Sequence, residues 1–252
     1  MKTRQEAKGG HWPRPWLLFF GCIVACGPSK RDCPPVAQIT QPIINGQAAA
    51  SDAATVAIGD VDGQIYCSGV LISAAGRTFV ATAAHCVDLS AYIFGGVDAL
   101  APQFVAKVSA RTKDERYDSD QRYDLGLLSA PDIPPSWARL PLSDERGSLL
   151  GQNERIVGFG LTSLSGAPAH LRETITVTVN KSDDVNFQYA QDSGGPCSGD
   201  SGGPALDPKT GILVGLTSSG DIFCRSYGVS VRAWWLWDLI APLDPGECPK
   251  VD

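Results

Sequence analysis

The sequence predicts an all-β fold, a barrel or a sandwich, that ends in one helix. Short apolar or alternating segments follow one another between turns rich in Gly, Pro and Asp. A run of short strands with turns at regular intervals is typical of β-barrels and β-sandwiches. Residues 174–179, for example, read Thr-Ile-Thr-Val-Thr-Val, the alternation of a half-buried strand. The other clear strand segments are residues 64–72, 78–83 and 211–217.

The C-terminal region has a different period. Residues 231–240 lack alternation and place Trp234, Trp237 and Ile240 at helical spacing. We expect a helix over this segment that ends at Pro242, because proline cannot continue a helix. The tryptophans could form a membrane or ligand surface, but we interpret them as the contact of a helix packed on a barrel.

The composition is that of an ordinary globular protein with an acidic body. Of its 252 residues 43% are hydrophobic and 19% charged, which excludes a collagen, a coiled coil and a disordered chain. Residues 1–25 hold four basic residues and one acidic residue, a charge of +3, so the rest of the chain carries −9 of the total of −6. An acidic body offers no electrostatic footprint for nucleic acid, so we expect no such partner.

Residues 1–25 have the pattern of a signal peptide. A basic stretch precedes an apolar run, 16–25, that is too short for a stable membrane span. The run ends in Ile-Val-Ala before Cys26, which resembles the lipobox of bacterial lipoproteins. The resemblance implies cleavage before Cys26, a lipid on its thiol and a bacterial envelope location, the outer membrane where the cell has one. Residues 26–42 would form a tether and pro-segment. The alternative is an ordinary secretory signal and a secreted protein.

The cysteine count fits an exported protein. Removal of the signal peptide and lipidation of Cys26 leave an even number of cysteines, and thiols pair in an oxidising compartment. The count alone does not choose among the many possible pairings. No CxxC pair or Cys/His cluster in the sequence suggests zinc, so we expect disulfides and neither a metal nor a cofactor. The remaining cysteines are Cys33, Cys67, Cys86, Cys197, Cys224 and Cys248.

Three polar residues stand in segments that suit catalysis. His85 lies among small residues, in Ala-Thr-Ala-Ala-His-Cys, which leaves an imidazole accessible. Ser201 lies in Gly-Asp-Ser-Gly-Gly-Pro, whose glycines permit tight turns and close approach of a substrate. Between them, Asp124 directly precedes an apolar segment, residues 125–128. A serine hydroxyl becomes a good nucleophile when an adjacent base takes its proton.

These motifs, in the order His, Asp, Ser, resemble the trypsin/chymotrypsin family of serine proteases. The resemblance covers residues 43–240 and includes Gly-Phe-Gly at 158–160. It implies two six-stranded antiparallel Greek-key barrels and a C-terminal helix. The protease domain would then span 43–252, with a first barrel over about 43–137 and a second over about 138–252.

The resemblance also implies the role of each residue. His85 would be the general base, Asp124 would hold its tautomer, and Ser201 would be the nucleophile. The backbone N–H groups of Gly199 and Ser201 would form the oxyanion hole.

Asp124 is one of several acids in this part of the chain. The charged run 113–122 contains Asp114, Asp118 and Asp120, which we interpret as members of a solvated loop. Asp124 abuts an apolar strand, so we expect it alone to be buried.

The family pattern implies two disulfides, Cys67–Cys86 beside the base and Cys197–Cys224 beside the specificity pocket. Cys33 and Cys248 are then left to pair with each other, a bridge that the family pattern does not supply. Such a bridge would keep a cut domain attached to its lipidated stub.

The specificity pocket that the resemblance implies is uncharged. Its base, six residues before the nucleophile, is Gly195, and its walls include Ser218, Gly220 and Gly228. An open, uncharged pocket implies apolar or aromatic side chains at the cleaved position (P1) rather than Lys or Arg. The alternative is that a shifted loop brings Asp192 into the pocket.

The activation segment departs from the family pattern. Ile43 resembles the family's new N-terminus, whose α-amine pairs after cleavage with the Asp before the nucleophile, here Asp200. The family is usually cut after Lys or Arg, whereas Pro42 precedes Ile43. Either an unusual protease cuts this bond, or another group satisfies Asp200 without a cut.

The residues together predict an exported, lipid-anchored serine endopeptidase that acts as a monomer on protein or peptide substrates. The alternative is a non-catalytic, protease-like binding module at the cell envelope, because fold and site chemistry can separate. All three triad positions are filled, which favours the enzyme. An esterase is disfavoured, because Gly-x-Ser-x-Gly stands here in an all-β setting instead of a strand–helix elbow.

Overall fold

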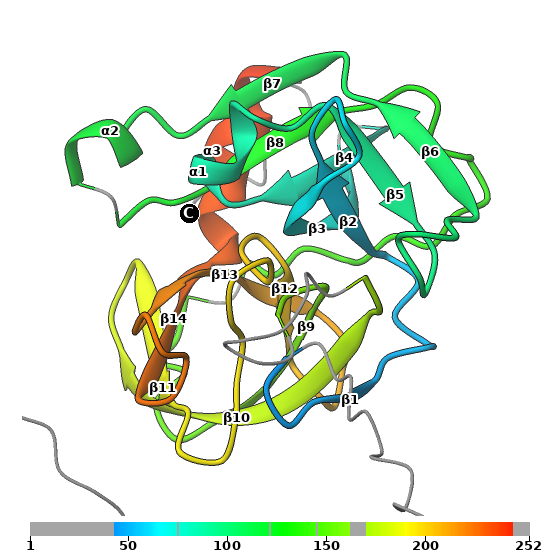
Figure 1. Cartoon of the computed structure of the whole chain (residues 1–252). Coiled ribbons are helices and arrows are strands. Elements are labelled where there is room, and N and C mark those ends of the chain that lie inside the picture. Colours follow the sequence, from blue (N-terminus) through cyan, green and yellow to red (C-terminus); the bar gives the residue numbers. More distant parts are fainter. Residues whose placement is uncertain (1–42, 75, 121, 145, 162–169, 244–252) are drawn as a thin grey trace, which may run out of the picture. The chain divides into compact units, whose positions relative to one another are not determined.

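The structure is a computed structural model, and it describes residues 43–243 except 75, 121, 145 and 162–169 (Figure 1). Two antiparallel sheets, each curled into a barrel-like form, make up most of it. The first has the strand order β6-β5-β2-β3-β4-β8-β7. The second has the order β1-β10-β11-β14-β13-β12-β9 and closes through pairing of β9 with β10. The predicted all-β, two-barrel fold with a C-terminal helix is confirmed.

The strands are short, and those predicted from the sequence fall on β3, β4, β10 and β13. The first sheet contains β2 (Thr55–Gly59), β3 (Ile65–Ala74), β4 (Arg77–Thr82), β5 (Tyr92–Gly95), β6 (Phe104–Lys107), β7 (Ala110–Lys113) and β8 (Gly126–Ser129). The second contains β1 (Gln47–Ala48), β9 (Asn153–Gly158), β10 (Glu173–Ser182), β11 (Asn186–Ala190), β12 (Pro204–Leu206), β13 (Leu213–Gly220) and β14 (Tyr227–Arg232). Two single-turn helices, α1 (Ala84–Val87) and α2 (Tyr117–Asp120), lie in loops of the first barrel.

Each sheet has seven strands among the described residues, where six are expected. In the first sheet, one stretch of chain changes partner: the Val108 N–H donates to Ala91 and the Ser109 N–H to Ser129, so β6 and β7 count separately. In the second sheet, the additional strand is β1, which pairs with β10. Strand β1, which the predicted boundaries place with the first barrel, therefore belongs to the second sheet, and Ile44 forms an isolated bridge with Gly195.

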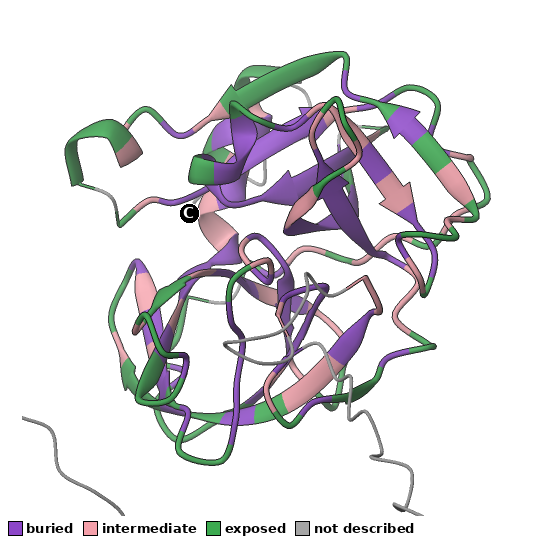
Figure 2. Ribbon diagram, viewed as in Figure 1, coloured by how far each residue is buried: buried purple, intermediate pink, exposed green. Residues whose placement is uncertain are grey.

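Apolar side chains fill both barrels (Figure 2). One cluster occupies the first barrel and includes residues of the second barrel that face it, and a smaller one lies inside the second barrel. The alternation of 174–179 has the expected effect, because Val177 and Val179 are buried while Thr176 and Thr178 are exposed. Burial of each such valine contributes roughly 1.5–3 kcal/mol.

The C-terminal helix is shorter than predicted. Val231 and Arg232 still belong to β14, and a 3₁₀ turn, Ala233–Trp235, precedes helix α3 (Leu236–Ile240). The reason is that Val231 pairs with both neighbouring strands and is buried. Pro242 lies inside a second 3₁₀ turn, Ala241–Leu243, where its missing N–H is tolerated.

Helix α3 packs on the first barrel as predicted. Leu236, Leu239 and Ile240 belong to the large apolar cluster, and Trp237 packs against it. Trp234 stacks on Trp235 with ring centroids 3.7 Å apart. Within the described residues, we find no helix with the length and apolar character of a membrane span.

Candidate active site

His85 and Asp124 come from neighbouring strands of the first barrel. His85 lies on α1, directly after β4, and Asp124 lies directly before β8; β4 and β8 pair, with Thr82 opposite Gly126. His85 Nδ1 lies 2.7 Å from Asp124 Oδ2, and the His85 backbone N–H donates to Asp124 Oδ1 at 3.0 Å. An ionised carboxylate only accepts, so Nδ1 carries the hydrogen and Nε2 is left to act as a base.

The Asp124 carboxylate is buried and well supplied with donors. It is 2% exposed. Ser218, on β13 of the second barrel, donates its hydroxyl to Asp124 Oδ2 at 2.7 Å. The third hydrogen bond to Asp124 therefore comes from the second barrel. It connects this acid of the first barrel to the pocket that Ser218 lines.

Asp114 differs from expectation, because it too is buried, at 5% exposure. Arg116 explains this: its Nε and Nη2 donate to the Asp114 carboxylate at 2.8 and 2.6 Å. The same guanidinium lies 4.0 Å from the centre of the Tyr123 ring. Asp118 and Asp120 are exposed, as expected of a solvated loop.

Ser201 lies in a loop of the second barrel that is bound to the first. Its carbonyl accepts the Ser68 N–H at 2.8 Å, and the next residue, Gly202, donates its N–H to Thr217 at 2.7 Å. A Cβ on Gly202 would lie 2.1 Å from Thr82 Oγ1, so only glycine fits there. Ser201 itself is half-buried and lines a pocket of about 240 Å³.

The carbonyl groups that precede Gly199 and Ser201 are both held by backbone hydrogen bonds. The Ser198 carbonyl accepts from the Leu161 N–H at 2.7 Å, and the Asp200 carbonyl from the Gly203 N–H at 2.9 Å. Because C=O and N–H point to opposite sides of a trans peptide, the N–H groups of Gly199 and Ser201 point away from these partners. Neither N–H donates to a protein group within the part of the chain that the structure describes.

Ser68 locks this arrangement, a role that nothing in the sequence indicates. Its hydroxyl donates to the Gly199 carbonyl at 2.8 Å and accepts the Phe159 N–H at 2.9 Å. Gly199 has a φ of 97°, a conformation that favours glycine. One hydroxyl of the first barrel thus fixes two loops of the second.

Asp200, beside the nucleophile position, is fully buried. Gly160 donates its N–H to one carboxylate oxygen at 2.7 Å, and Cys197 to the other at 2.8 Å. A Cβ on Gly158 or Gly160 would come within 2.1 or 2.2 Å of this carboxylate, which explains the Gly-Phe-Gly motif. Burial raises the pKa of Asp200 to about 7.

The segment that starts at Ile43 is docked on the second barrel. Ile43 is fully buried, and Ile44 exchanges two backbone hydrogen bonds of 3.1 Å with Gly195. The Asn45 amide donates to the Ser193 carbonyl at 3.1 Å. Ile43 has a φ of 55°, an uncommon conformation for a β-branched residue.

The pocket beside Ser201 is narrower than its glycines imply. Ser218 and Gly220 line it, together with Ser198 and Ile222, whereas Gly195 and Gly228 are not among its lining residues. Asp192 is exposed and does not line the pocket either.

Larger side chains occupy the space beside two of these glycines. A Cβ on Gly195 would lie 2.1 Å from Gln191 Nε2, and one on Gly228 would lie 2.4 Å from the Tyr189 ring. Gln191 Oε1 is buried and has no hydrogen-bond partner among the described residues. It lies close to Gly220, 3.6 Å from the position that a Cβ on this glycine would take. The sequence does not reveal these fillings, because they depend on the register of β11 with β14.

Two disulfides have the pairing that the resemblance implies, Cys67–Cys86 and Cys197–Cys224. They indicate an exported protein. Cys26, Cys33 and Cys248 lie outside the described residues, and so does the predicted Cys33–Cys248 bridge.

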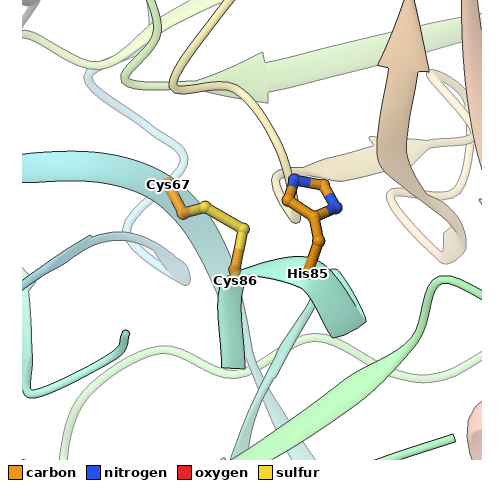
Figure 3. Close-up of side chains that lie close together, drawn as sticks. All are labelled: Cys67, His85 and Cys86. Carbon is orange, nitrogen blue, oxygen red and sulfur yellow. A yellow bond between two sulfur atoms is a disulfide. The ribbon is translucent and has the colours of Figure 1, made fainter. Parts of the chain in front are cut away.

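The Cys67–Cys86 disulfide lies beside the His85 imidazole, and Cys86 and His85 share helix α1 (Figure 3). The ligand atoms of these three residues lie within 4.8 Å of one another, close enough to hold a metal. Metals bind thiolates, however, and both sulfurs are joined in the disulfide, so we assign no metal to this group.

Known proteins with similar sequences include a protease and a protein named as an inhibitor. The family model Trypsin matches residues 43–236. The chain is 28% identical over 250 residues to a chymotrypsin of Phaedon cochleariae, covering 83% of this chain and 89% of that protein. It is 27% identical over 209 residues to glucanase inhibitor protein 4 of Phytophthora infestans, covering 71% and 79%.

Solved structures give the same fold. Human heparin binding protein superimposes with a TM-score of 0.69 at 24% identity, covering 82% of this chain and 100% of that one. Neuropsin, a serine protease of mouse brain, gives a TM-score of 0.69 at 20% identity, covering 80% and 100%.

Proposed function

The chain belongs to the trypsin family, and from this premise we propose that it is a serine endopeptidase with His85, Asp124 and Ser201 as its catalytic triad. Family membership indicates a peptidase that acts on protein or peptide substrates. The observation that carries the finer proposal is the 2.7 Å contact between His85 and Asp124, whose carboxylate also accepts the hydroxyl of Ser218 from the pocket that Ser201 lines.

The proposed reaction is acyl transfer. His85 Nε2 takes the proton of the Ser201 hydroxyl as its oxygen attacks the substrate carbonyl, and returns it to the leaving amine. The Asp124 carboxylate stabilises the imidazolium that forms. The N–H groups of Gly199 and Ser201 bind the negative oxygen of the tetrahedral intermediate; loss of one such donor typically costs about 3 kcal/mol. Water then hydrolyses the acyl-enzyme.

The second candidate is a protease-like binding module. Of two similar proteins, one is named as a glucanase inhibitor and the other as a heparin binding protein, and neither name describes a protease. Against this reading stand the filled triad positions and the three donors on Asp124.

Activation by a cut before Ile43 remains part of the proposal. The new α-ammonium of Ile43 would supply the positive charge that the buried Asp200 lacks. Ile43 is already buried in the intact chain, so the cut requires little movement of the segment that follows it.

The proposed location is the outside of a bacterial membrane, through a lipid on Cys26. Replacement of Cys26 by Ser is expected to move the protein from the membrane fraction to the soluble fraction and to remove a diacylglyceryl mass from the N-terminal peptide. Membrane association that survives the substitution would contradict the lipid anchor. If Cys33 pairs with Cys248, a cut chain will release its stub on a gel only when reductant is present.

A fluorophosphonate probe tests the activity. We expect it to label the cut chain at Ser201, and Ser201→Ala to abolish this labelling, because alanine has no hydroxyl for the probe to modify. Ser109→Ala, at an exposed serine of the first barrel that does not line the pocket, is the control and should label normally. Labelling of the intact chain would mean that Asp200 is satisfied without a cut. A folded chain that labels in neither form would favour the binding module.

A further inference from the structure

Glu173, at the start of β10, is a buried acid that the triad does not use. It is 4% exposed, and its Oε2 has no hydrogen-bond partner among the described residues. Its backbone lies between β1 and β9, opposite Ala48 and Gly158. A buried carboxyl without a partner is costly, so its position calls for a chemical reason.

The Glu173 carboxyl lies against the segment that starts at Ile43. A Cβ on Gly46 would lie 2.6 Å from Glu173 Oε2, 2.9 Å from the Ile43 Cβ and 3.0 Å from the Ile43 carbonyl oxygen. Gly46 also donates its N–H to that carbonyl at 2.7 Å. The turn 43–46 therefore brings Ile43 close to the unpartnered oxygen.

Glu173 shares a face of the sheet with Asp200. Residues directly opposite on antiparallel strands place their side chains on the same face. Glu173 is opposite Gly158, and the place of a Gly158 Cβ is filled by Asp200, whose Oδ1 would lie 2.1 Å from it. Two buried carboxyls thus lie on either side of one glycine.

Within the part of the chain that the structure describes, no cationic side chain is paired with Glu173 or Asp200. Segment 43–48 carries no ionisable side chain, and β9 presents Gly158. Arg172, the neighbour of Glu173, donates instead to four carbonyls elsewhere, those of Ala49, Ala50, Thr55 and Gly96. Burial, and then the charge of Asp200, raises the pKa of Glu173 to about 8.

We propose that Glu173 is a positioning residue that binds, together with Asp200, the α-ammonium created by a cut before Ile43. Water adds across the Pro42–Ile43 peptide bond, leaving a carboxylate on Pro42 and an ammonium on Ile43. The ammonium has three N–H donors, and each Asp200 oxygen already accepts one backbone N–H. Glu173 Oε2, in contrast, accepts no hydrogen bond from any described residue, so it can accept one from the ammonium. The inference rests on the proposed activation of this chain.

A second carboxylate has a consequence that a purely structural residue would not have. An ammonium held by two carboxylates loses its proton at a higher pH than one held by Asp200 alone. The cut chain should therefore keep its N-terminus buried, and its oxyanion loop ordered, to more alkaline pH.

The test measures burial of the Ile43 amine directly. In the full chain carrying Ser201→Ala, residues Gln38–Pro42 are replaced by Asp-Asp-Asp-Asp-Lys, and enteropeptidase then cuts before Ile43. Cyanate modifies an exposed, neutral α-amine, and mass spectrometry of the N-terminal peptide gives its rate from pH 6 to 10. Glu173→Gln is compared with the parent.

Glu154→Gln is the matched control. Glu154 is also buried, at 1% exposure, its Oε2 also lacks a partner among the described residues, and burial raises its pKa to about 7. It lies on β9 opposite Val177, and the acid that contributes to its raised pKa is Asp207 instead of Asp200.

We expect Glu173→Gln to lower the pH at which the amine becomes reactive by about one unit, so that modification at a given pH is about tenfold faster. Glu154→Gln should match the parent. The inference is overturned if Glu173→Gln matches the parent, if both variants lose protection equally, or if the parent's amine is unprotected. Because the Ser201→Ala chain is inactive by design, the result does not depend on whether the chain is a protease.

Discussion

Two buried aspartates, Asp124 and Asp200, lie in contrasting surroundings. Asp124 is 2% exposed and receives hydrogen bonds from the His85 ring, the His85 backbone and the Ser218 hydroxyl. Asp200 is 0% exposed and receives two backbone N–H groups. The first faces a side chain that can become a cation, whereas the second has another acid, Glu173, as its charged neighbour.

The proposed site has two halves, the His85–Asp124 pair and the loop that carries Ser201, and the two aspartates show that they differ in the intact chain. The acid–base pair is assembled within the first barrel, and the intact chain already places it. The loop that carries Ser201 contains Asp200, whose buried carboxyl has no cationic partner among the described residues. A buried charge of this kind is tolerated when it is neutralised or paired. The following predictions test that difference.

The largest effect is expected on the Asp124 side. Asp124→Asn should lower the labelling rate of the cut chain about 10⁴-fold, because an amide holds the imidazole in the wrong tautomer. Ser218→Ala removes one of three donors and should cost far less. The control is Asp114→Asn, also buried but paired with Arg116; its melting temperature should fall while labelling is retained. If Asp124→Asn and Asp114→Asn lowered the labelling rate equally, the special role proposed for Asp124 would be contradicted.

On the Asp200 side the effect should depend on the cut. Asp200→Asn should lower labelling of the cut chain by about 10²–10³-fold, the scale of a damaged oxyanion hole. In the intact chain at pH 8, the same substitution should lower the melting temperature only modestly. Asn removes a carboxyl that burial disfavours as a charge, but its amide nitrogen faces one of the two backbone N–H groups that Asp200 accepts. A large loss of stability, about 3–5 kcal/mol as for a broken buried ion pair, would show that Asp200 is already paired.

The pH dependence of stability should separate the two forms. Burial raises the pKa of Asp200 from 3.8 to about 7 and that of Glu173 from 4.5 to about 8. A carboxyl whose pKa is raised in the folded protein contributes its full stability at pH values below its ordinary pKa. This contribution is lost as the pH rises from there through the raised pKa values of about 7 and 8. We expect the melting temperature of the intact chain to fall by about 5 °C between pH 5 and pH 8.5. Calorimetry of the cut chain should show a smaller fall; parallel curves would argue against an ammonium in this pocket.

The smallest effect concerns the specificity pocket. Gln191→Ala removes the side chain that fills the space beside Gly195 and should deepen the pocket. Cleavage of a peptide library should shift toward larger apolar P1 residues by about tenfold. Gln188→Ala, on the neighbouring strand β11, serves as the control. An unchanged P1 profile would mean that Gln191 does not limit the pocket.

Much of the fold and the core of the site could be predicted because they have local signals. The alternation at 174–179 and the short apolar segments between turns located four strands. The glycines around Ser201 and the small residues around His85 marked the candidate site. Two predictions were wrong for different reasons. Val231 stays in β14 because it pairs with distant strands on both sides, and Asp114 is buried because Arg116, two residues away, pairs with its carboxylate.

The sequence by itself determined the strand pattern, the candidate triad and the absence of a charge at the expected pocket base, since these depend on residue type and on neighbours a few positions away. Only the tertiary structure decided the partners: Ser68 on Gly199, Gln191 beside Gly195, and Glu173 beside the turn at Gly46. The first and the last of these contacts join residues far apart in the chain, whereas Gln191 and Gly195 lie four positions apart in a loop whose conformation the fold sets. Strand register and barrel packing set them, and a buried carboxyl's charge state follows from them rather than from its neighbours in sequence.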